Sequence, residues 1–262
     1  MIIIKNNRAI TMMRQAGGLL AQVFDSIAPC IVEGVSTLSI EQAAVKALAH
    51  YGLKSESLGY RGYKYSTCIS VNDEVVHGMP RADRLLTTGD VVSVDICASW
   101  RGYCADMART YIIGAAREQV QHFVQTAQSA LDAGIAQAVV GNHLSDISAA
   151  IEREVTRNGY QVVHDFAGHG IGRSMHEDPE ILNYGQPGHG PVLCAGMTLA
   201  IEPMITMGGY DVFVADDGWT VKTKDKSLAA HSEDTVLVTE REPEIFTRAI
   251  LNENCASLKG DV

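Results

Sequence analysis

The sequence has few cysteines, a deficit of basic residues and no long apolar run, and each shortage excludes a class of protein. Six cysteines are scattered over 262 residues without a Cys-x-x-Cys pair, so a disulfide scaffold is not predicted. No apolar stretch approaches the length of a membrane span, and the opening MIIIKNNRAI lacks the apolar core of a signal peptide. We therefore expect a cytoplasmic protein with free thiols.

The charge balance is acidic. The 21 Lys and Arg residues against 31 Asp and Glu residues give a formal net charge of -10, and no basic run stands out. This balance argues against nucleic acids and anionic membranes as partners. The hydrophobic content of 46% and charged content of 20% are ordinary for a globular protein. The chain is long enough for one large or two small domains.

Apolar periodicity predicts four helices, arranged as two pairs that are each followed by strands. The helices are expected near 10–27, 38–51, 117–140 and 144–158, with strands near 161–166, 197–207 and 235–239 and a hairpin described below. Sliding the sequence by 107 residues places Gly34 on Gly141 and Gly52 on Gly159. The pattern predicts a doubled helix-helix-sheet unit.

The hairpin is predicted in VVSVDICASWRGYCADMARTY, residues 91–111, where each strand carries one aspartate among apolar or small residues. A turn between the tryptophan and arginine of Ser-Trp-Arg-Gly would pair Asp95 with Asp106 and Cys97 with Cys104. Alternation then puts all four side chains on one small, acidic face. Facing carboxylates repel each other, so a shared proton, a nearby cationic side chain or a metal must neutralise them.

Two further acids lie in strand-like runs, Glu202 in MTLAIEPMITM and Glu233 in AAHSEDTVLVT, and His169 lies among glycines in AGHGIGRSMHEDP. A solvent-facing acidic strip is the alternative to a site. Buried carboxylates without a cation would each cost on the order of several kcal/mol. Carboxylates with one imidazole suit Mn, Fe, Co or Zn, and a pair of such ions activates water for hydrolysis. The pattern therefore favours a two-metal centre.

These motifs together resemble the type I methionine aminopeptidases, which have the α+β pita-bread fold. The likeness covers the opening IKNNRAITMMRQAG, the spacing of Asp95 and Asp106, GHGIGRSMHEDP, LAIEP and Glu233 shortly before TVLVT. It implies a single catalytic domain, 1–262, with two pseudo-symmetric helix-helix-sheet halves, about 5–113 and 114–250, around a central two-metal cleft.

The resemblance also implies the site residues. The two metals, Co, Mn, Fe or Zn, would be bound by Asp95, Asp106, His169, Glu202 and Glu233. Asp106 and Glu233 would bridge both ions, and Glu202 would also move the proton of the attacking water. His77 in VVHGMP and His176 would contact the substrate at the scissile bond. Substrate would also contact the apolar pocket of Tyr60, Tyr63, Cys68, Met175 and Trp219.

The activity implied by the resemblance is removal of the N-terminal methionine from nascent proteins and peptides, with preference for a small second residue. A hydroxide shared by the two metals would attack the first peptide bond. The implied protein is a cytoplasmic monomer that acts on nascent N-termini near the ribosome and contacts neither nucleic acid nor membrane directly.

The chain departs from the family pattern at several positions. Where the family usually has Ala-Gln-aromatic-Glu-His-Thr, this chain has AHSEDT, which places Ser232 and Asp234 beside Glu233. Met175 replaces a common aromatic residue and Arg61 replaces a common histidine. These changes bear on the shape of the pocket and on the surroundings of the expected bridging ligand.

Three alternatives stay open. Proline-specific aminopeptidases share the fold and the ligands but usually carry a further N-terminal domain, for which the residues before the first helix leave little room. Some pita-bread proteins only bind partners and have lost their metal, whereas this chain keeps every expected ligand. A phosphate-binding glycine loop at GHGIG would need the spacing Gly-x-Gly-x-x-Gly, which is not present.

Overall fold

The computed structural model describes residues 1–248, so the last residues of the range 114–250 lie outside the described part of the chain. The helices are α1 (Asn7–Ile27), α2 (Thr37–His50), α3 (Glu118–Ile135) and α4 (Leu144–Arg157), with short 3₁₀ helices η1 (Ala28–Cys30), η2 (Tyr60–Gly62) and η3 (Phe246–Arg248). The strands are β1 (Lys54–Ser55), β2 (Cys68–Val71), β3 (Glu74–Val76), β4 (Val91–Trp100), β5 (Tyr103–Ile112), β6 (Gln161–Val162), β7 (Gly168–Gly170), β8 (Glu177–Ile181), β9 (Thr198–Ile201), β10 (Met204–Thr206), β11 (Val212–Val214), β12 (Val221–Thr223), β13 (Ala229–His231), β14 (Glu233–Leu237) and β15 (Glu244–Ile245).

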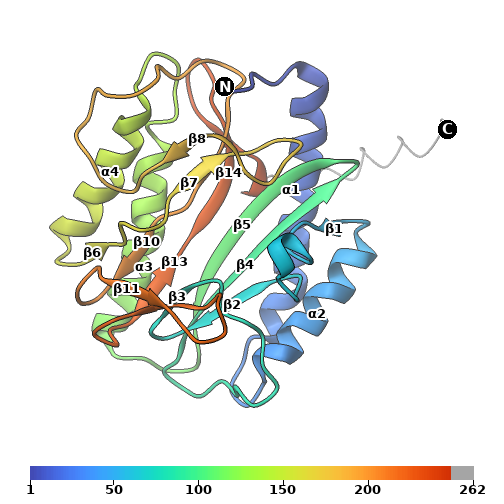
Figure 1. The fold of residues 1–262 in the computed structure, drawn as a ribbon, viewed down its shortest axis with the longest axis vertical. Coiled ribbons are helices and arrows are strands. Elements are labelled where there is room, and N and C mark those ends of the chain that lie inside the picture. The colour runs from blue at the N-terminus through green and yellow to red at the C-terminus, as the bar shows by residue number, and fades with distance from the viewer. Residues whose placement is uncertain (249–262) are drawn as a thin grey trace.

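The four helices form two packed pairs, α1 with α2 and α3 with α4, and the second helices of the pairs are related by the offset of the predicted repeat. Helices α2 and α4 begin at Thr37 and Leu144, which are 107 residues apart. Each is followed by a glycine in the left-handed region, Gly52 with φ 68° and Gly159 with φ 82°. A left-handed glycine ends a helix at low cost because it has no Cβ. Figure 1 shows α1 and α2 beside one part of the sheet and α3 and α4 beside the other.

Helix α3 is shorter than its apolar pattern predicts. It ends at Ile135 rather than near residue 140. The residues beyond it pair with a distant segment, because Val139 forms a parallel bridge with Thr239 and the Val140 N–H donates to the Thr239 carbonyl at 3.0 Å. Tertiary pairing therefore replaces the last predicted turn.

The strands form one large and two small antiparallel sheets. The nine-stranded sheet runs β1-β4-β5-β14-β9-β7-β8, with β2 also paired to β4 and β15 to β14. The small sheets are β13-β10-β6 and β11-β12-β3. The strand predicted over 197–207 is interrupted between β9 and β10 at Glu202 and Pro203, since proline has no N–H for the ladder. The strand predicted over 161–166 is limited to β6.

The predicted register of the β4–β5 hairpin is wrong. Trp100 pairs with Tyr103, and the turn consists of Arg101 and Gly102, both with positive φ (49° and 76°). Two left-handed residues make the hairpin turn that suits the twist of the strands, and glycine takes the second position without strain. Consequently Asp95 pairs with Ala108, and Cys97 pairs with Asp106.

The corrected register leaves the two faces as predicted but changes the cysteine geometry. Cys104 lies opposite Ser99, so the expected direct pairing of Cys97 with Cys104 is also wrong. The two thiols are diagonal neighbours, both buried and free. Diagonal neighbours lie farther apart than directly opposed ones. The expected direct opposition of the two thiols is therefore lost, and both remain free, as expected from the sequence.

The helices cover one face of the large sheet. Val92, Val94 and Ile96 of β4 pack in one apolar core with α1 and α2. Leu199 of β9 and Val236 of β14 pack in a second core with α3 and α4. Because side chains alternate across a strand, the residues between these positions face away from the helices. Asp95, Asp106 and Glu233 therefore lie on the opposite side of the sheet.

Candidate metal centre

Three carboxylates converge from three neighbouring strands. Ala108 of β5 pairs with Asp95 of β4 on one side and with Glu233 of β14 on the other. Asp106 is two residues before Ala108 and so shares its face. Asp106 and Glu233 are buried, with 5% and 2% of their surfaces exposed, whereas Asp95 is partly buried. Pairing and alternation therefore place the three carboxylates on the same face of neighbouring strands.

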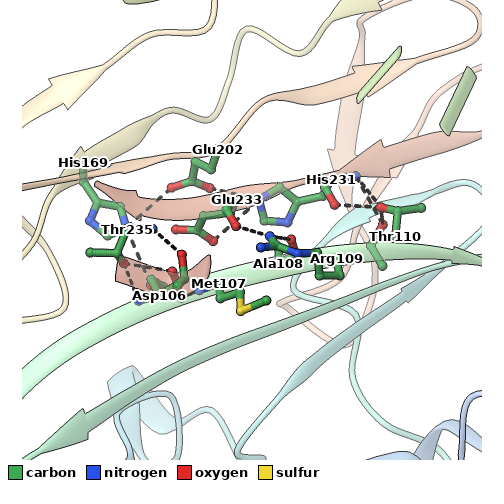
Figure 2. Close-up of polar contacts among 12 residues, drawn as sticks. Asp106, Met107, Ala108, Arg109, Thr110, His169, Glu202, His231, Glu233 and Thr235 are labelled. Atoms are coloured by element: carbon green, nitrogen blue, oxygen red, sulfur yellow. Dashed lines mark hydrogen bonds and ion pairs between the residues drawn. The ribbon is translucent and has the colours of Figure 1, made fainter. Parts of the chain in front are cut away.

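His169 and Glu202 complete this cluster from the second part of the sheet. The His169 Nε2 atom lies 3.5 Å from Glu202 Oε1 and 3.9 Å from Asp106 Oδ2, as Figure 2 shows. The Nδ1 atom of His169 is 2.9 Å from the Gly170 carbonyl. This contact fixes the ring with Nδ1 as the donor and Nε2 directed at the carboxylates.

The glycines on either side of His169 are required by close packing of the strands. A Cβ at position 168 would lie 2.5 Å from the Ala200 carbonyl oxygen, and one at position 170 would lie 2.0 Å from the Asp178 carbonyl oxygen. Only glycine permits such an approach. The Gly-His-Gly motif therefore brings β7 close enough to its neighbours for His169 to reach the acids.

The electrostatics of the cluster show how costly its charges are. Burial raises the pKa of Glu202 to about 8. Burial, together with the charge of Glu202, raises the pKa of Asp106 to about 7. Burial first, and then repulsion from Asp106, also raises the pKa of Asp95 and of Glu233. Burial lowers the pKa of His169 to about 4, with a smaller contribution from His176. Neutral imidazole next to crowded carboxyls is the state in which histidine ligates metals.

The cluster fits divalent metal ions. Glu233 Oε1 is buried and accepts no hydrogen bond from the described residues. Burying an acceptor without a partner costs folding free energy. One donor atom each from Asp106, His169 and Glu233 lies within 4.8 Å of the others. Oxygen donors with one nitrogen donor suit Mn, Fe, Co and Zn. A cation would offset the repulsion and satisfy the lone pair.

The predicted site residues all line one pocket of about 260 Å³. The metal-ligand candidates lie together in it, and its other predicted members are Tyr60, Tyr63, Cys68, His77, Met175, His176 and Trp219. Trp219 and Tyr63 meet edge to face with ring centroids 5.0 Å apart. The His176 Nδ1 atom is 3.1 Å from the Tyr60 hydroxyl. The pocket thus combines an acidic floor with largely apolar and aromatic walls.

His77 lies in this pocket in a rare backbone conformation. Its φ is 59°, which a residue with a Cβ seldom adopts. Its ring is edge-on to Phe166, with centroids 5.6 Å apart. Burial lowers its pKa to about 4, with His231 and His176 as lesser causes. The left-handed backbone thus places a neutral imidazole in the lining of the pocket, next to Phe166 and Trp219.

Comparison with known proteins decides the family. Residues 11–240 match the family described as Metallopeptidase family M24. The chain belongs to the M24 metallopeptidases. A relative from Clostridium acetobutylicum named methionine aminopeptidase is 44% identical over 94% of this chain and 99% of its own length. The methionine aminopeptidase 1 of Bacillus subtilis is 40% identical over 95% of this chain and 100% of its own length.

Solved structures give the same family fold. The crystal structure of methionine aminopeptidase from Thermotoga maritima matches with a TM-score of 0.93 and 42% identity, over 95% of this chain and 100% of that one. The prolidase of Pyrococcus furiosus matches in fold alone, with a TM-score of 0.74 and 22% identity, over 94% of this chain and 66% of that one. The predicted α+β pita-bread class is confirmed. Membership of M24 implies the use of divalent metal.

In this M24 chain, Asp234 departs from the family pattern, and its carboxylate is bound by other side chains on the helix side of the sheet. Asp234 is fully buried and accepts hydrogen bonds from Arg109 Nη2 at 2.6 Å, Thr247 Oγ1 at 2.6 Å and Arg248 Nε at 2.7 Å. Arg109 Nη1 also donates to the Glu233 carbonyl at 2.6 Å. The two arginines thus fix the strand that carries the bridging-ligand candidate.

A second cavity of about 510 Å³ lies on this helix side, and none of the predicted site residues lines it. Arg109, Arg248 and Asp132 are among its lining residues. Arg248 Nη2 donates to Asp132 Oδ1 at 2.7 Å, so its charge is already compensated within the chain. The chemistry of the M24 site therefore belongs to the smaller pocket.

His231 is the residue of this site that sequence reasoning missed. It ends β13, is 2% exposed, and has its Nε2 atom 3.4 Å from Glu202 Oε2 and 3.9 Å from Glu233 Oε2. The available signal was its position two residues before Glu233, because residues two apart in a strand share a face. Burial lowers its pKa, although the charge of Asp95 acts in the opposite direction.

Proposed function

We propose that this M24 chain removes the N-terminal methionine from peptides and nascent proteins. The observation that carries the proposal is the convergence of Asp106, His169 and Glu233 with Glu202 at the floor of an apolar pocket. Full-length relatives named methionine aminopeptidase at 40% and 44% identity support it.

The site is proposed to hold two divalent ions of cobalt, manganese, iron or zinc. Their proposed ligands are Asp95, Asp106, His169, Glu202 and Glu233. Asp106 and Glu233 are the candidates to contact both ions, because their carboxylates lie in the middle of the cluster between the strands of its other members. When bound, such a pair polarises a peptide carbonyl and lowers the pKa of water. The raised pKa values of the carboxyls support this assignment, since a cation relieves their mutual repulsion.

The remaining polar residues are assigned to proton transfer and positioning. Glu202, whose carboxylate lies at the acidic floor of the pocket, can accept the proton of the attacking water and deliver it to the leaving amine. His176 is oriented by the Tyr60 hydroxyl at its Nδ1 atom, which leaves Nε2 to donate to the carbonyl oxygen of the scissile bond. His77, whose ring lies 6.4 Å from that of Trp219 between centroids, would also contact the substrate.

The pocket walls suit a methionine side chain. Tyr63 and Cys68 are buried, and Trp219 closes on the Tyr63 ring. Burial raises the pKa of both the Cys68 thiol and the Tyr63 phenol, so both stay neutral. A thioether is flexible and polarisable, and it makes favourable contacts with aromatic rings. Met175 and Tyr60 complete the lining. The preference for a small second residue is proposed from the likeness to methionine aminopeptidases.

The same proposal covers organisation and cellular context. We assign one catalytic domain to 1–262, with pseudo-symmetric halves near 5–113 and 114–250, and a cytoplasmic monomer acting on nascent N-termini near the ribosome without direct contact to nucleic acid or membrane. The net charge of -10 supports the last point. In the described part of the chain, no helix combines the length and apolar character needed to cross a membrane.

The test is release of free methionine from synthetic peptides by protein loaded with Mn or Co. Met-Ala-Ser should be cleaved, whereas Met-Leu-Ser should be cleaved slowly because of its bulky second residue. Leu-Ala-Ser tests the first position, and Ala-Pro-Ser tests the proline-specific alternative. Cleavage of Ala-Pro-Ser in preference to Met-Ala-Ser would overturn the proposal, as would absence of any cleavage by metal-loaded protein.

A further inference from the structure

His231 occupies a position from which it can reach the metal centre directly. It lies at the end of β13, and its ring lies next to the carboxylates of Glu202 and Glu233 (Figure 2). In the family pattern an amide side chain, glutamine, usually occupies this position. A glutamine offers an oxygen or an NH₂ group, whereas a neutral histidine offers a nitrogen lone pair that ligates metals.

The ring nitrogen that faces the acids makes no hydrogen bond to the part of the chain that the structure describes. His231 Nε2 is buried and lacks a hydrogen bond within the described residues, and the same holds for Glu233 Oε1. Buried polar atoms are nearly always satisfied in native proteins. Two unsatisfied atoms in one cluster of candidate metal-binding residues point to a shared partner between them. A hydrogen bond from Nε2 to Glu202 would leave the Glu233 oxygen unsatisfied.

Glu202 is flanked by an imidazole at each oxygen. Its Oε1 atom is 3.5 Å from His169 Nε2, and its Oε2 atom is 3.4 Å from His231 Nε2. Each oxygen of this carboxylate therefore lies near one ring nitrogen, from β7 or from β13. This arrangement offers a metal two nitrogen donors and several oxygen donors.

The separations between donors fit binding to one ion. With ligand bonds of about 2.0–2.2 Å, two donor atoms on the same ion are roughly 3 Å apart when they bind at a right angle. They are about 4.2 Å apart when they bind on opposite sides of the ion. The distances from His231 Nε2 to Glu202 Oε2 and Glu233 Oε2 are 3.4 Å and 3.9 Å. Each donor of Glu202, His231 and Glu233 also lies within 4.8 Å of the other two.

We propose that His231, through Nε2, is a sixth protein ligand of the metal centre. The inference rests on the metal centre proposed above and adds a ligand to it. A second imidazole makes the ligand set richer in nitrogen, and imidazole suits Zn, Co and Fe whereas an oxygen-rich set suits Mn. The chain should therefore discriminate against Mn more strongly than a variant that restores the usual glutamine.

The decisive measurement is a proton NMR spectrum of the full chain loaded with cobalt(II), recorded in water. A histidine bound to cobalt through Nε2 gives one strongly shifted, exchangeable resonance from its Nδ1–H. The wild type should show two such resonances, one from His169 and one from His231. His231→Gln should show one shifted resonance. The control is His122→Gln, which removes a histidine of α3 that lies beside Tyr160. This control should keep two shifted resonances.

Competition between metals provides the second readout. His231→Gln should lose at least about tenfold in affinity for zinc, the scale of losses around metal-bound histidines, and less for manganese. A wild-type spectrum with a single shifted resonance overturns the role of His231 while the metal centre stands. A spectrum without shifted resonances at saturating cobalt overturns the metal centre as well. Since the wild type alone distinguishes these outcomes, the test does not depend on folding of the variant.

Discussion

The substitution Asp234→Asn should strongly destabilise the protein, although it only replaces one carboxylate oxygen with an NH₂ group. Asp234 has no exposed side-chain surface, and its carboxylate compensates Arg109 and Arg248, whose side chains are 19% and 35% exposed. The neutral amide removes that compensation from Arg109 and leaves Arg248 paired with Asp132. Its NH₂ group also faces donors where an acceptor is required, either toward Thr247 and Arg109 or toward Arg248.

The size of the effect follows from burial. Removing one partner of a buried ion pair costs about 3–5 kcal/mol, because the other charge is left uncompensated. The lower end applies here since both arginines keep some contact with solvent, so we expect about 3 kcal/mol. For a chain of this length each kcal/mol lowers Tm by about 2–4 °C, which corresponds to a fall of roughly 6–12 °C.

The assay is urea unfolding of the metal-free protein followed by far-UV circular dichroism, together with a thermal melt. Asp83→Asn is the matched control, because Arg81 binds Asp83 through two hydrogen bonds of 2.9 and 2.7 Å while both side chains are more than half exposed (63% and 71%). Exposed ion pairs contribute little, so the control should unfold like the wild type. A loss for Asp234→Asn below about 0.5 kcal/mol, the range of ordinary surface substitutions, would refute the reasoning.

Four further predictions concern the metal centre and the substrate. Asp106→Asn should give a folded protein without activity at saturating metal, since a neutral amide no longer holds two cations together; wild-type turnover would contradict the bridging role. Glu202→Gln should bind metal but lose most turnover, because an amide accepts no proton, and an unaltered pH–rate profile would count against proton transfer. In titrations of metal-free protein, the apparent metal affinity should fall as the pH drops from 8 to 6. The raised pKa values of Glu202 and Asp106, about 8 and about 7, mean that the metal must displace more protons at lower pH. A metal affinity that does not change with pH would contradict this. Untagged protein should retain Met1, since Ile2 is bulky, and intact-mass measurement showing its efficient removal would contradict the size preference.

Much of the fold was readable because local signals and tertiary structure agree. The glycines that end α2 and α4, Gly52 and Gly159, mark helix ends in the sequence and adopt left-handed conformations in the structure. Aspartates in otherwise apolar strands indicated a shared site because burial of unpaired charge is costly. Asp95 and Asp106 accordingly share one face of the hairpin. The shared face was predictable from alternation alone.

Other features could not be read because they depend on pairing between distant segments. The hairpin register was missed since it is decided by the left-handed conformations of Arg101 and Gly102, and only the glycine signals them. The role of Asp234 depends on Arg109, which is 125 residues away and belongs to another strand. His231 carried a signal, its spacing from Glu233, but Ser232 separates β13 from β14, so a continuous strand was not evident.

The spread of the ligand candidates along the chain, from Asp95 to Glu233, links metal supply to the integrity of the whole fold. No single strand or helix pair contains the set, so an ion held by these residues binds only the fully folded chain. Each tenfold rise in free ion above its Kd then adds about 1.4 kcal/mol to global stability. A chelator would act on this protein as a mild denaturant, and cells starved of the metal would lose the protein to proteolysis as well as its activity.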